Sequence, residues 1–287
     1  MSAVLVARSL RDAIVPLSDD EAVALAGGTD LMVDVNAGRI RPRRLVSLAR
    51  VAELAGYRDE GDGLVLGANT TYRELIELGH RRTEDPRARL LAEMASGVGS
   101  PASRNVGTLG GALGTARGNG DALTALVALD AVLLVAGVAG TRSMPATAWP
   151  SGRRRGEVIV EIHLAPMPAG SVAHYTKVTP RHAMSTAIVN CALTVSSTQV
   201  RCSVGGVGPR PVRATGAERL AAEAMPRTGR RTADLAYRFG AAVADEIDPP
   251  GTWRVPAEYR RHAVAVLAAR SLRACLTESA RTWAHLA

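Results

Sequence analysis

The spacing of apolar residues over positions 1–55 predicts a small lobe of mixed helix and strand. Ser9 to Asp12 have the pattern of a capping box, in which a hydroxyl and a carboxylate bind each other's backbone amides at a helix start. The apolar residues Ala22 to Leu25 indicate a short strand, and Leu31 to Val35 indicate a second helix after a glycine turn. Leu45 to Leu48 indicate another short strand.

A second mixed lobe is predicted over residues 56–172. Leu64 to Ala68 have the pattern of a strand, and Thr71 to Glu74 form a second capping box that opens a helix. Another helix is predicted from Pro86 to about Ala95, and the run Val158 to Ile162 is typical of a β-strand that closes the lobe.

The pattern changes in residues 173–287. Two alternating strands, Val189 to Ser196 and Val200 to Val207, are separated by a short turn and predict a β-hairpin. Three helical stretches follow, at Glu218 to Ala224, Thr232 to Ile247 and Glu258 to Leu276. We therefore predict an α+β fold, in which two mixed lobes are followed by a C-terminal domain of a small β-sheet plus helices.

The charge of the chain raises the question of nucleic-acid binding. The 287 residues carry a net charge of +8 and have a pI of about 10.2. However, runs such as Arg41 to Arg44 and Arg153 to Arg155 lie in loop-like surroundings, and one Phe and five Tyr leave little material for base stacking. We expect no nucleic acid among the partners and keep a nucleic-acid module only as a minor alternative, recognisable by steep salt dependence.

The sequence gives no sign of a metal site or a membrane segment. The three cysteines are scattered, and neither a Cys-x-x-Cys pair nor a His-Glu-x-x-His pattern is present. We therefore expect no metal, zinc or iron–sulfur cluster on this chain, and reduced, buried thiols at Cys191, Cys202 and Cys275. No apolar run approaches the roughly 20 residues that span a bilayer, and no signal peptide is recognisable, so we predict a cytoplasmic protein.

Two pairs of adjacent glycines are the candidate ligand-binding motifs. They occur in Ala26-Gly27-Gly28-Thr29-Asp30 and in Gly107-Thr108-Leu109-Gly110-Gly111. Adjacent glycines allow positive φ and direct successive amides toward one point, so each loop can form an anion-binding nest, and two nests suit a dinucleotide pyrophosphate. Either loop by itself is also explained as a tight turn.

A third glycine string does not have the context of a nicotinamide site. Gly97 to Ala102 matches Gly-x-Gly-x-x-Ala, but it follows a helical pattern rather than a strand and contains Pro101. Lys177 is a different kind of signal, because it is the one lysine among 35 basic residues. A compact ammonium at that position is either a functional requirement or a chance of composition.

The ordered set of motifs resembles the FAD subunit of the xanthine dehydrogenase and carbon monoxide dehydrogenase family. The resemblance covers nearly the whole chain. It rests on the two glycine loops, Asp121, the strand at Glu157 to Ile162, Tyr175-Thr176-Lys177 with Arg181, and Gly205 to Ala214. It implies a two-lobed FAD-binding domain of the PCMH type, with lobes at 1–55 and 56–172, and a C-terminal flavoprotein domain at 173–287.

The resemblance also implies roles for individual residues. The two glycine loops would hold the FAD pyrophosphate through backbone amides, and Asp121 would accept hydrogen bonds from FAD hydroxyls. Ile159 would pack on the flavin or adenine end, and Lys177 would place a positive charge near the isoalloxazine and tune its potential. Asn119 is a candidate amide donor, and Tyr175 either shields the ring or is a core tyrosine.

By the same resemblance, the holoenzyme is a molybdenum hydroxylase in which this chain is the electron-transfer flavoprotein. A large subunit would carry molybdopterin, a small subunit would carry [2Fe-2S] clusters, and the whole would form a dimer of heterotrimers. Electrons would pass through FAD to an external electron acceptor, so no catalytic residue is expected on this oxidoreductase subunit. The substrate and the acceptor are not encoded in any motif.

Two alternatives remain open at this point. The first is a stand-alone FAD-dependent oxidoreductase with its own substrate. The second is a degenerate scaffold subunit with weakened FAD binding, because Ala112 stands where the family usually has Asn. The stretch from Ala116 to Asp121 also lacks the family's usual Ser-Pro pair.

Overall fold

The computed structural model describes residues 3–182, 184–225 and 231–283, and these form two compact units. Unit 1 comprises residues 1–75, 100–116 and 130–166, and unit 2 comprises residues 76–99, 117–129 and 167–287. The chain therefore passes repeatedly between the units. The boundaries predicted near residues 55 and 172 divide the chain consecutively, and they stay a prediction.

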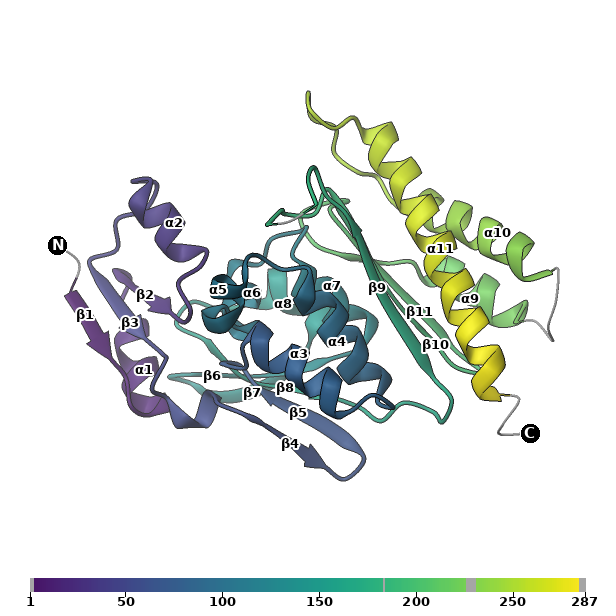
Figure 1. The fold of residues 1–287 in the computed structure, drawn as a ribbon. Helices are drawn as coiled ribbons and strands as arrows, with labels where there is room; N and C mark the ends of the chain where they lie inside the picture. The colour runs from purple at the N-terminus through teal and green to yellow at the C-terminus, as the bar shows by residue number, and fades with distance from the viewer. Residues whose placement is uncertain (1–2, 183, 226–230, 284–287) are drawn as a thin grey trace. The chain divides into compact units, whose positions relative to one another are not determined.

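Unit 1 contains two sheets with short helices (Figure 1). The three-stranded sheet is parallel, in the order β1 (Ala3–Val6), β3 (Arg44–Ser47), β2 (Ala22–Leu25). The five-stranded sheet is antiparallel, in the order β4 (Tyr57–Glu60), β5 (Gly63–Gly67), β8 (Val158–Leu164), β6 (Val132–Gly137), β7 (Gly140–Pro145). The helices are α1 (Leu10–Leu17), α2 (Leu31–Asn36), η1 (Ala52–Leu54), the start of α3 (Tyr72–Arg81), α5 (Pro101–Val106), α6 (Leu109–Thr115), η2 (Ala146–Ala148) and α8 (Trp149–Gly152).

Both capping boxes predicted from the sequence are confirmed. The Ser9 hydroxyl accepts a hydrogen bond from the Asp12 amide at 3.1 Å, and the Asp12 carboxylate accepts one from the Ser9 amide at 3.1 Å. At the start of α3, the Glu74 carboxylate accepts from the Thr71 amide at 2.7 Å, and the Thr71 hydroxyl accepts from the Glu74 amide at 3.2 Å. Each box satisfies backbone donors that have no partner within their helix.

Unit 2 is built on one antiparallel sheet (Figure 1). The strand order is β12 (Val212–Arg213), β11 (Val200–Gly205), β10 (Val189–Val195), β9 (Val172–Val178). The β10–β11 pair confirms the predicted hairpin. The helices are α4 (Pro86–Ser96), α7 (Asp121–Ala128), α9 (Thr215–Glu223), α10 (Arg231–Asp245) and α11 (Ala257–Trp283), and the last three confirm the helices expected after the hairpin.

Helices cover both faces of the unit 2 sheet. Helices α4 and α7 pack on one face, whereas α9, α10 and α11 lie on the other (Figure 1). Every residue of the central strand β10 is consequently buried. Its alternate residues Val189, Cys191, Leu193 and Val195 join the core beneath α9 to α11, and Asn190 faces α7 through a 2.9 Å hydrogen bond with Thr124.

Within these described residues no helix is long and apolar enough to cross a bilayer. In the same part of the chain, no three His, Cys, Asp or Glu side chains come together in a way that could bind a metal ion.

The core beneath α9 to α11 generates a stability prediction. Phe239 on α10 is fully buried there. We expect Phe239→Ala to lower the free energy of unfolding by about 3–5 kcal/mol, because it removes a large apolar side chain and leaves a cavity. Urea titration followed by circular dichroism measures this change. Tyr237→Ala on the same helix is the matched control, because the Tyr237 side chain is 76% exposed. A loss of more than about 1 kcal/mol of unfolding free energy in Tyr237→Ala would contradict the exposed position of this face of α10.

Candidate functional site

A cavity of about 620 Å³ lies within unit 1. Three segments form much of its wall: the turn between β2 and α2, helix α6, and the chain from α8 into the start of β8. The volume lies within the range of small-molecule and cofactor sites in proteins. The cavity thus gathers both glycine loops predicted from the sequence, together with the predicted residue Ile159.

The first glycine loop presents unpaired backbone amides to this cavity. All of Ala26 to Asp30 lie in the wall, and Gly28 has a φ of +71° that favours glycine. Within the described part of the chain, the amides of Gly27, Gly28 and Thr29 make no hydrogen bond. Three successive free donors are the arrangement that binds an anion such as a phosphate.

Gly27 is required by contact between backbones. A Cβ at this position would lie 1.8 Å from the carbonyl oxygen of Val106 and 3.0 Å from the Cα of Gly107. Any side chain would therefore push the first loop away from the segment that precedes the second loop. The glycine permits the approach that holds the two loops together.

The second glycine loop differs from the expected nest. Thr108 is the N-cap of α6, so Gly110 and Gly111 belong to the first turn of a helix, and neither has a positive φ. The Gly110 amide donates to the Ala68 carbonyl at 2.7 Å, and the Gly111 amide donates to the Thr108 hydroxyl at 3.0 Å. This corrects the prediction that both loops offer free amides, because the Gly110 amide bonds a distant backbone segment and the Gly111 amide bonds the N-cap of α6.

The contribution of the second loop to the cavity is steric. Thr108, Gly110 and Gly111 line the wall, whereas Leu109 is fully buried and its amide donates to the Thr70 carbonyl at 3.0 Å. Gly107 is not among the described lining residues, and its amide donates to Ser103. The glycines leave the wall without side chains, so a ligand can approach the backbone.

The polar residues at 149–157 in the cavity wall are not predicted from the sequence. The Trp149 indole donates to the Leu113 carbonyl at 2.8 Å, and Arg153 donates to the Gly114 carbonyl at 2.7 Å, so both cap the C-terminus of α6. Arg153, Arg154 and Arg155 line the cavity together with Glu157. Their position directly before a predicted strand is the available signal for this placement, whereas the pattern of the run itself indicates only loop-like surroundings.

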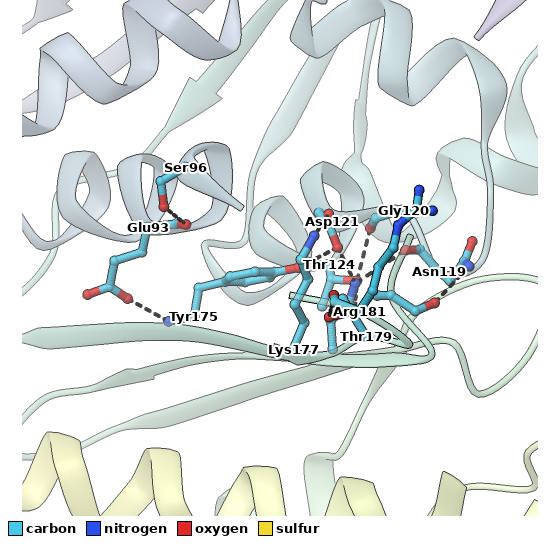
Figure 2. A network of polar contacts seen from close by, with 12 residues as sticks. Glu93, Ser96, Asn119, Gly120, Asp121, Thr124, Tyr175, Lys177, Thr179 and Arg181 are labelled. Carbon is cyan, nitrogen blue, oxygen red and sulfur yellow. Dashed lines mark hydrogen bonds and ion pairs between the residues drawn. The ribbon is translucent and has the colours of Figure 1, made fainter. Parts of the chain in front are cut away.

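Four other predicted site residues form a network in unit 2, on and beside the sheet face that carries α7 (Figure 2). Asp121, in the first turn of α7, accepts hydrogen bonds from Tyr175 at 2.6 Å and Asn190 at 3.0 Å on Oδ1. Its Oδ2 forms an ion pair with Lys177 Nζ at 2.6 Å. The Lys177 and Asp121 side chains are only 12% and 11% exposed, so the two charges compensate each other in a nearly dry environment.

Tyr175 and Asn119 have structural partners in this network. The Tyr175 side chain is buried and donates to Asp121, which favours the interpretation as a core tyrosine. The Asn119 side chain donates to the Ala187 carbonyl at 3.0 Å, and the Asn119 backbone carbonyl accepts from the Asn190 side chain at 3.3 Å. Asn119 therefore uses its amide to hold the end of a loop.

Gly97, in the rejected Gly-x-Gly-x-x-Ala string, provides space for Lys177. The string follows α4, and Ser100 is the N-cap of α5 with Pro101 as its first residue, so no strand precedes it. A Cβ at Gly97 would lie 3.2 Å from Lys177 Cε and 3.6 Å from Nζ. The string therefore lies between two helices, without the strand that a nicotinamide-type loop follows, and the glycine has a packing role.

Titratable groups near these sites are held by close partners. Hydrogen bonding to Arg142, at 2.7 Å for each carboxylate oxygen, lowers the pKa of Glu157 in the cavity wall. In unit 2, a hydrogen bond to Glu93 at 3.1 Å raises the pKa of His174. The same Glu93 carboxylate accepts from the Tyr175 amide at 2.8 Å (Figure 2). Both shifts therefore come from ion pairs that stabilise the charged forms.

A cavity of this size with three free amides suits a phosphate-containing cofactor. Comparison with known proteins makes the class specific. Residues 1–167 match the FAD binding domain in molybdopterin dehydrogenase, and residues 174–275 match the CO dehydrogenase flavoprotein C-terminal domain. The chain belongs to this family of FAD-binding subunits of molybdenum hydroxylases.

Individual relatives support this membership along the whole chain. The xanthine dehydrogenase FAD-binding subunit of Escherichia coli O157:H7 is 30% identical and is covered over 91% of each chain. The carbon monoxide dehydrogenase medium chain of Hydrogenophaga pseudoflava is 28% identical, over 88% of this chain and 89% of that one. A solved structure of carbon monoxide dehydrogenase from Hydrogenophaga pseudoflava superposes with a TM-score of 0.87 at 25% identity, over 96% of this chain and 98% of the other.

The comparisons confirm the α+β fold, the FAD cofactor and the oxidoreductase family predicted from the sequence. The residues of the cavity fit this cofactor, because free amides at one loop and a wall without side chains at the other suit a diphosphate. The roles assigned to single residues stay predictions.

The close packing of Gly110 in the second loop against Ala68 is testable by adding one methyl group. A Cβ at Gly110 would lie 2.8 Å from the Ala68 Cβ and 2.9 Å from its carbonyl oxygen. We expect Gly110→Ala to lower the free energy of unfolding by about 1–3 kcal/mol, because the added atom overpacks this contact. Urea titration measures the change. In the same helix, Gly114→Ala meets nothing within 4 Å and should leave stability equal or raise it by up to about 1 kcal/mol. Equal stability of Gly110→Ala and the parent would contradict the close packing.

Proposed function

We propose that this chain is the electron-transfer subunit of a molybdenum hydroxylase, and that it passes electrons from iron–sulfur clusters of a partner subunit through FAD to an external acceptor. The observation that carries the proposal is the cavity with the free amides of Gly27, Gly28 and Thr29, in a chain of this family. When bound, FAD supplies the chemistry, because a flavin accepts and releases electrons singly or in pairs.

The residues of the chain would bind and orient the cofactor. The three free amides would donate to the diphosphate, and Ile159, which is 5% exposed in the cavity wall, would contribute apolar contact. Asp121 already accepts two hydrogen bonds on Oδ1 and one on Oδ2. Because each carboxylate oxygen has two lone pairs, Oδ2 keeps room for one donor, such as a cofactor hydroxyl. The principal role of Asp121 is then to hold Lys177.

Partner subunits would supply the remaining redox groups. Cys191, Cys202 and Cys275 are buried in the core of unit 2, and burial raises the pKa of the Cys275 thiol. Thiols in such surroundings are unsuited to binding a cluster, since the thiolate is the ligand. We propose a molybdopterin-binding large subunit and a [2Fe-2S] small subunit as partners, in a cytoplasmic dimer of heterotrimers.

A scaffold with weakened FAD binding is the second candidate, and one observation favours it. Ala112, which replaces the family's usual Asn, lies in the wall of the cavity. Its amide donates to the Thr108 carbonyl within α6, so it restores no donor to a ligand.

The proposal is tested with the purified chain and its cognate iron–sulfur subunit. We expect the chain to carry stoichiometric FAD, and we expect its flavin absorbance to bleach when the pre-reduced iron–sulfur subunit is added. A flavin that is reduced by a small substrate without the partner would instead identify a stand-alone oxidoreductase. A colourless chain that does not bind added FAD would identify a scaffold.

The role of Lys177 is tested by the reduction potential of the bound flavin. A nearby cation stabilises the anionic reduced flavin, so Lys177→Gln should lower the two-electron midpoint potential by about 30 mV, which corresponds to about 1.4 kcal/mol. Because the change also leaves Asp121 unpaired, we expect a stability loss of about 1–3 kcal/mol.

Spectroelectrochemical titration measures the potential, and the double variant Lys177→Gln/Asp121→Asn separates the two effects, since it leaves no unpaired charge. Arg219→Gln, at an exposed position of α9, is the control for loss of a positive charge in unit 2. An unchanged potential in Lys177→Gln would remove Lys177 from the cofactor environment.

A further inference from the structure

The wall of the FAD cavity carries charged side chains of both signs. Three are acidic and three are basic: Asp30, Asp34, Glu157, Arg153, Arg154 and Arg155. A diphosphate brings negative charge into this cavity, so its affinity depends on which of these side chains already have a partner. The three arginines therefore differ in their availability to a diphosphate according to the partners that each side chain has.

Several of the charges are neutralised by residues outside the cavity wall. Asp34 pairs with Arg39 at 2.7 Å, and Glu157 pairs with Arg142 at 2.7 Å. Arg155 pairs with Asp20 at 2.8 Å. These pairs contribute little net field at a ligand.

The two other arginines differ in what holds them. The Arg153 guanidinium donates to the Gly114 carbonyl at 2.7 Å, which fixes it at the end of α6. The Arg154 backbone amide donates to the Glu157 carboxylate at 2.7 Å, so its position in the chain is fixed. Its side chain is exposed and makes no hydrogen bond or ion pair within the described residues, although its charge contributes to lowering the pKa of Glu157. Arg154 thus combines an anchored backbone with an available guanidinium.

We propose that Arg154 binds the diphosphate of the FAD cofactor. It would act together with the amides of Gly27, Gly28 and Thr29, which belong to a different segment of the cavity wall. The amides supply directional donors, and the guanidinium supplies a full charge with a planar pair of donors that matches phosphate oxygens. This role rests on the proposed diphosphate site at the first glycine loop. It makes Arg154 a determinant of cofactor affinity that acts through charge.

The test compares FAD affinity of the deflavinated chain by flavin fluorescence titration at low and moderate ionic strength. We expect Arg154→Gln to raise the dissociation constant about tenfold at low salt, as for loss of one charge-assisted hydrogen bond. The salt dependence of binding should become flatter, because salt screens the lost attraction. Arg154→Lys, which keeps the charge but not the planar fork, should lie between the two. Arg11→Gln, an exposed change on α1, is the charge control and should match the parent.

The outcomes separate this inference from the proposed function. If the parent and Arg154→Gln bind FAD equally well, Arg154 has no role, and the proposed function stands. If Arg154→Gln binds more weakly but with the parent's salt dependence, Arg154 does not act through its charge, and the inference is overturned. If the parent chain binds no FAD, both fail together.

Discussion

Contact between backbone segments at glycine is the constraint on which the cofactor cavity depends. A Cβ at Gly27 would lie 1.8 Å from the Val106 carbonyl oxygen, and one at Gly110 would lie 2.8 Å from the Ala68 Cβ. Segments distant in sequence touch at these points only because a side chain is missing. The same contacts decide where hydrogen-bond donors go. In the second loop the amides of Gly110 and Gly111 donate to Ala68 and Thr108. In the first loop three successive amides have no partner within the described residues. The two glycine pairs look alike in sequence, yet one packs against another backbone segment and the other leaves free donors in the cavity wall.

In unit 2 the polar network around Asp121 depends on the compensation of a buried charge. Because helices cover both faces of its sheet, a carboxylate at Asp121 loses water and must be compensated by neighbouring donors. Tyr175, Asn190 and Lys177 provide this compensation at 2.6 to 3.0 Å. Gly97 leaves space beside the lysine side chain. A short ammonium side chain fits this geometry better than a broad guanidinium, which gives a structural reason for one lysine in a chain that otherwise uses arginine.

Much of the fold could be predicted from the sequence, because its signals are local. The capping boxes at Ser9 and Thr71, the β10–β11 hairpin and the three C-terminal helices all follow from residue spacing. The cavity was predictable only in part. Two glycines after a threonine predict a turn as readily as a helix start. The Gly110 amide is not free for a ligand because it donates to Ala68, a residue that is distant in sequence. The sequence also does not predict which arginine of the run is available to a ligand. Arg153 and Arg155 bind Gly114 and Asp20, which are distant in sequence, and within the described residues Arg154 has no such partner.

The charge arrangement bears on how such a chain sets a flavin potential. Lys177 and Asp121 form a nearly buried pair whose charges sum to zero, so at a distance they act as a dipole rather than as a cation. The effect of a dipole falls off faster with distance than that of a single charge and changes sign with orientation. A flavin on the ammonium side is stabilised in its reduced, anionic form, whereas a flavin on the carboxylate side is destabilised. The hydrogen bonds from Tyr175 and Asn190 draw negative charge on Asp121 toward Oδ1, away from Lys177 on Oδ2. They therefore leave the ammonium less fully compensated, which is the property that the proposed effect of Lys177 on the flavin potential requires.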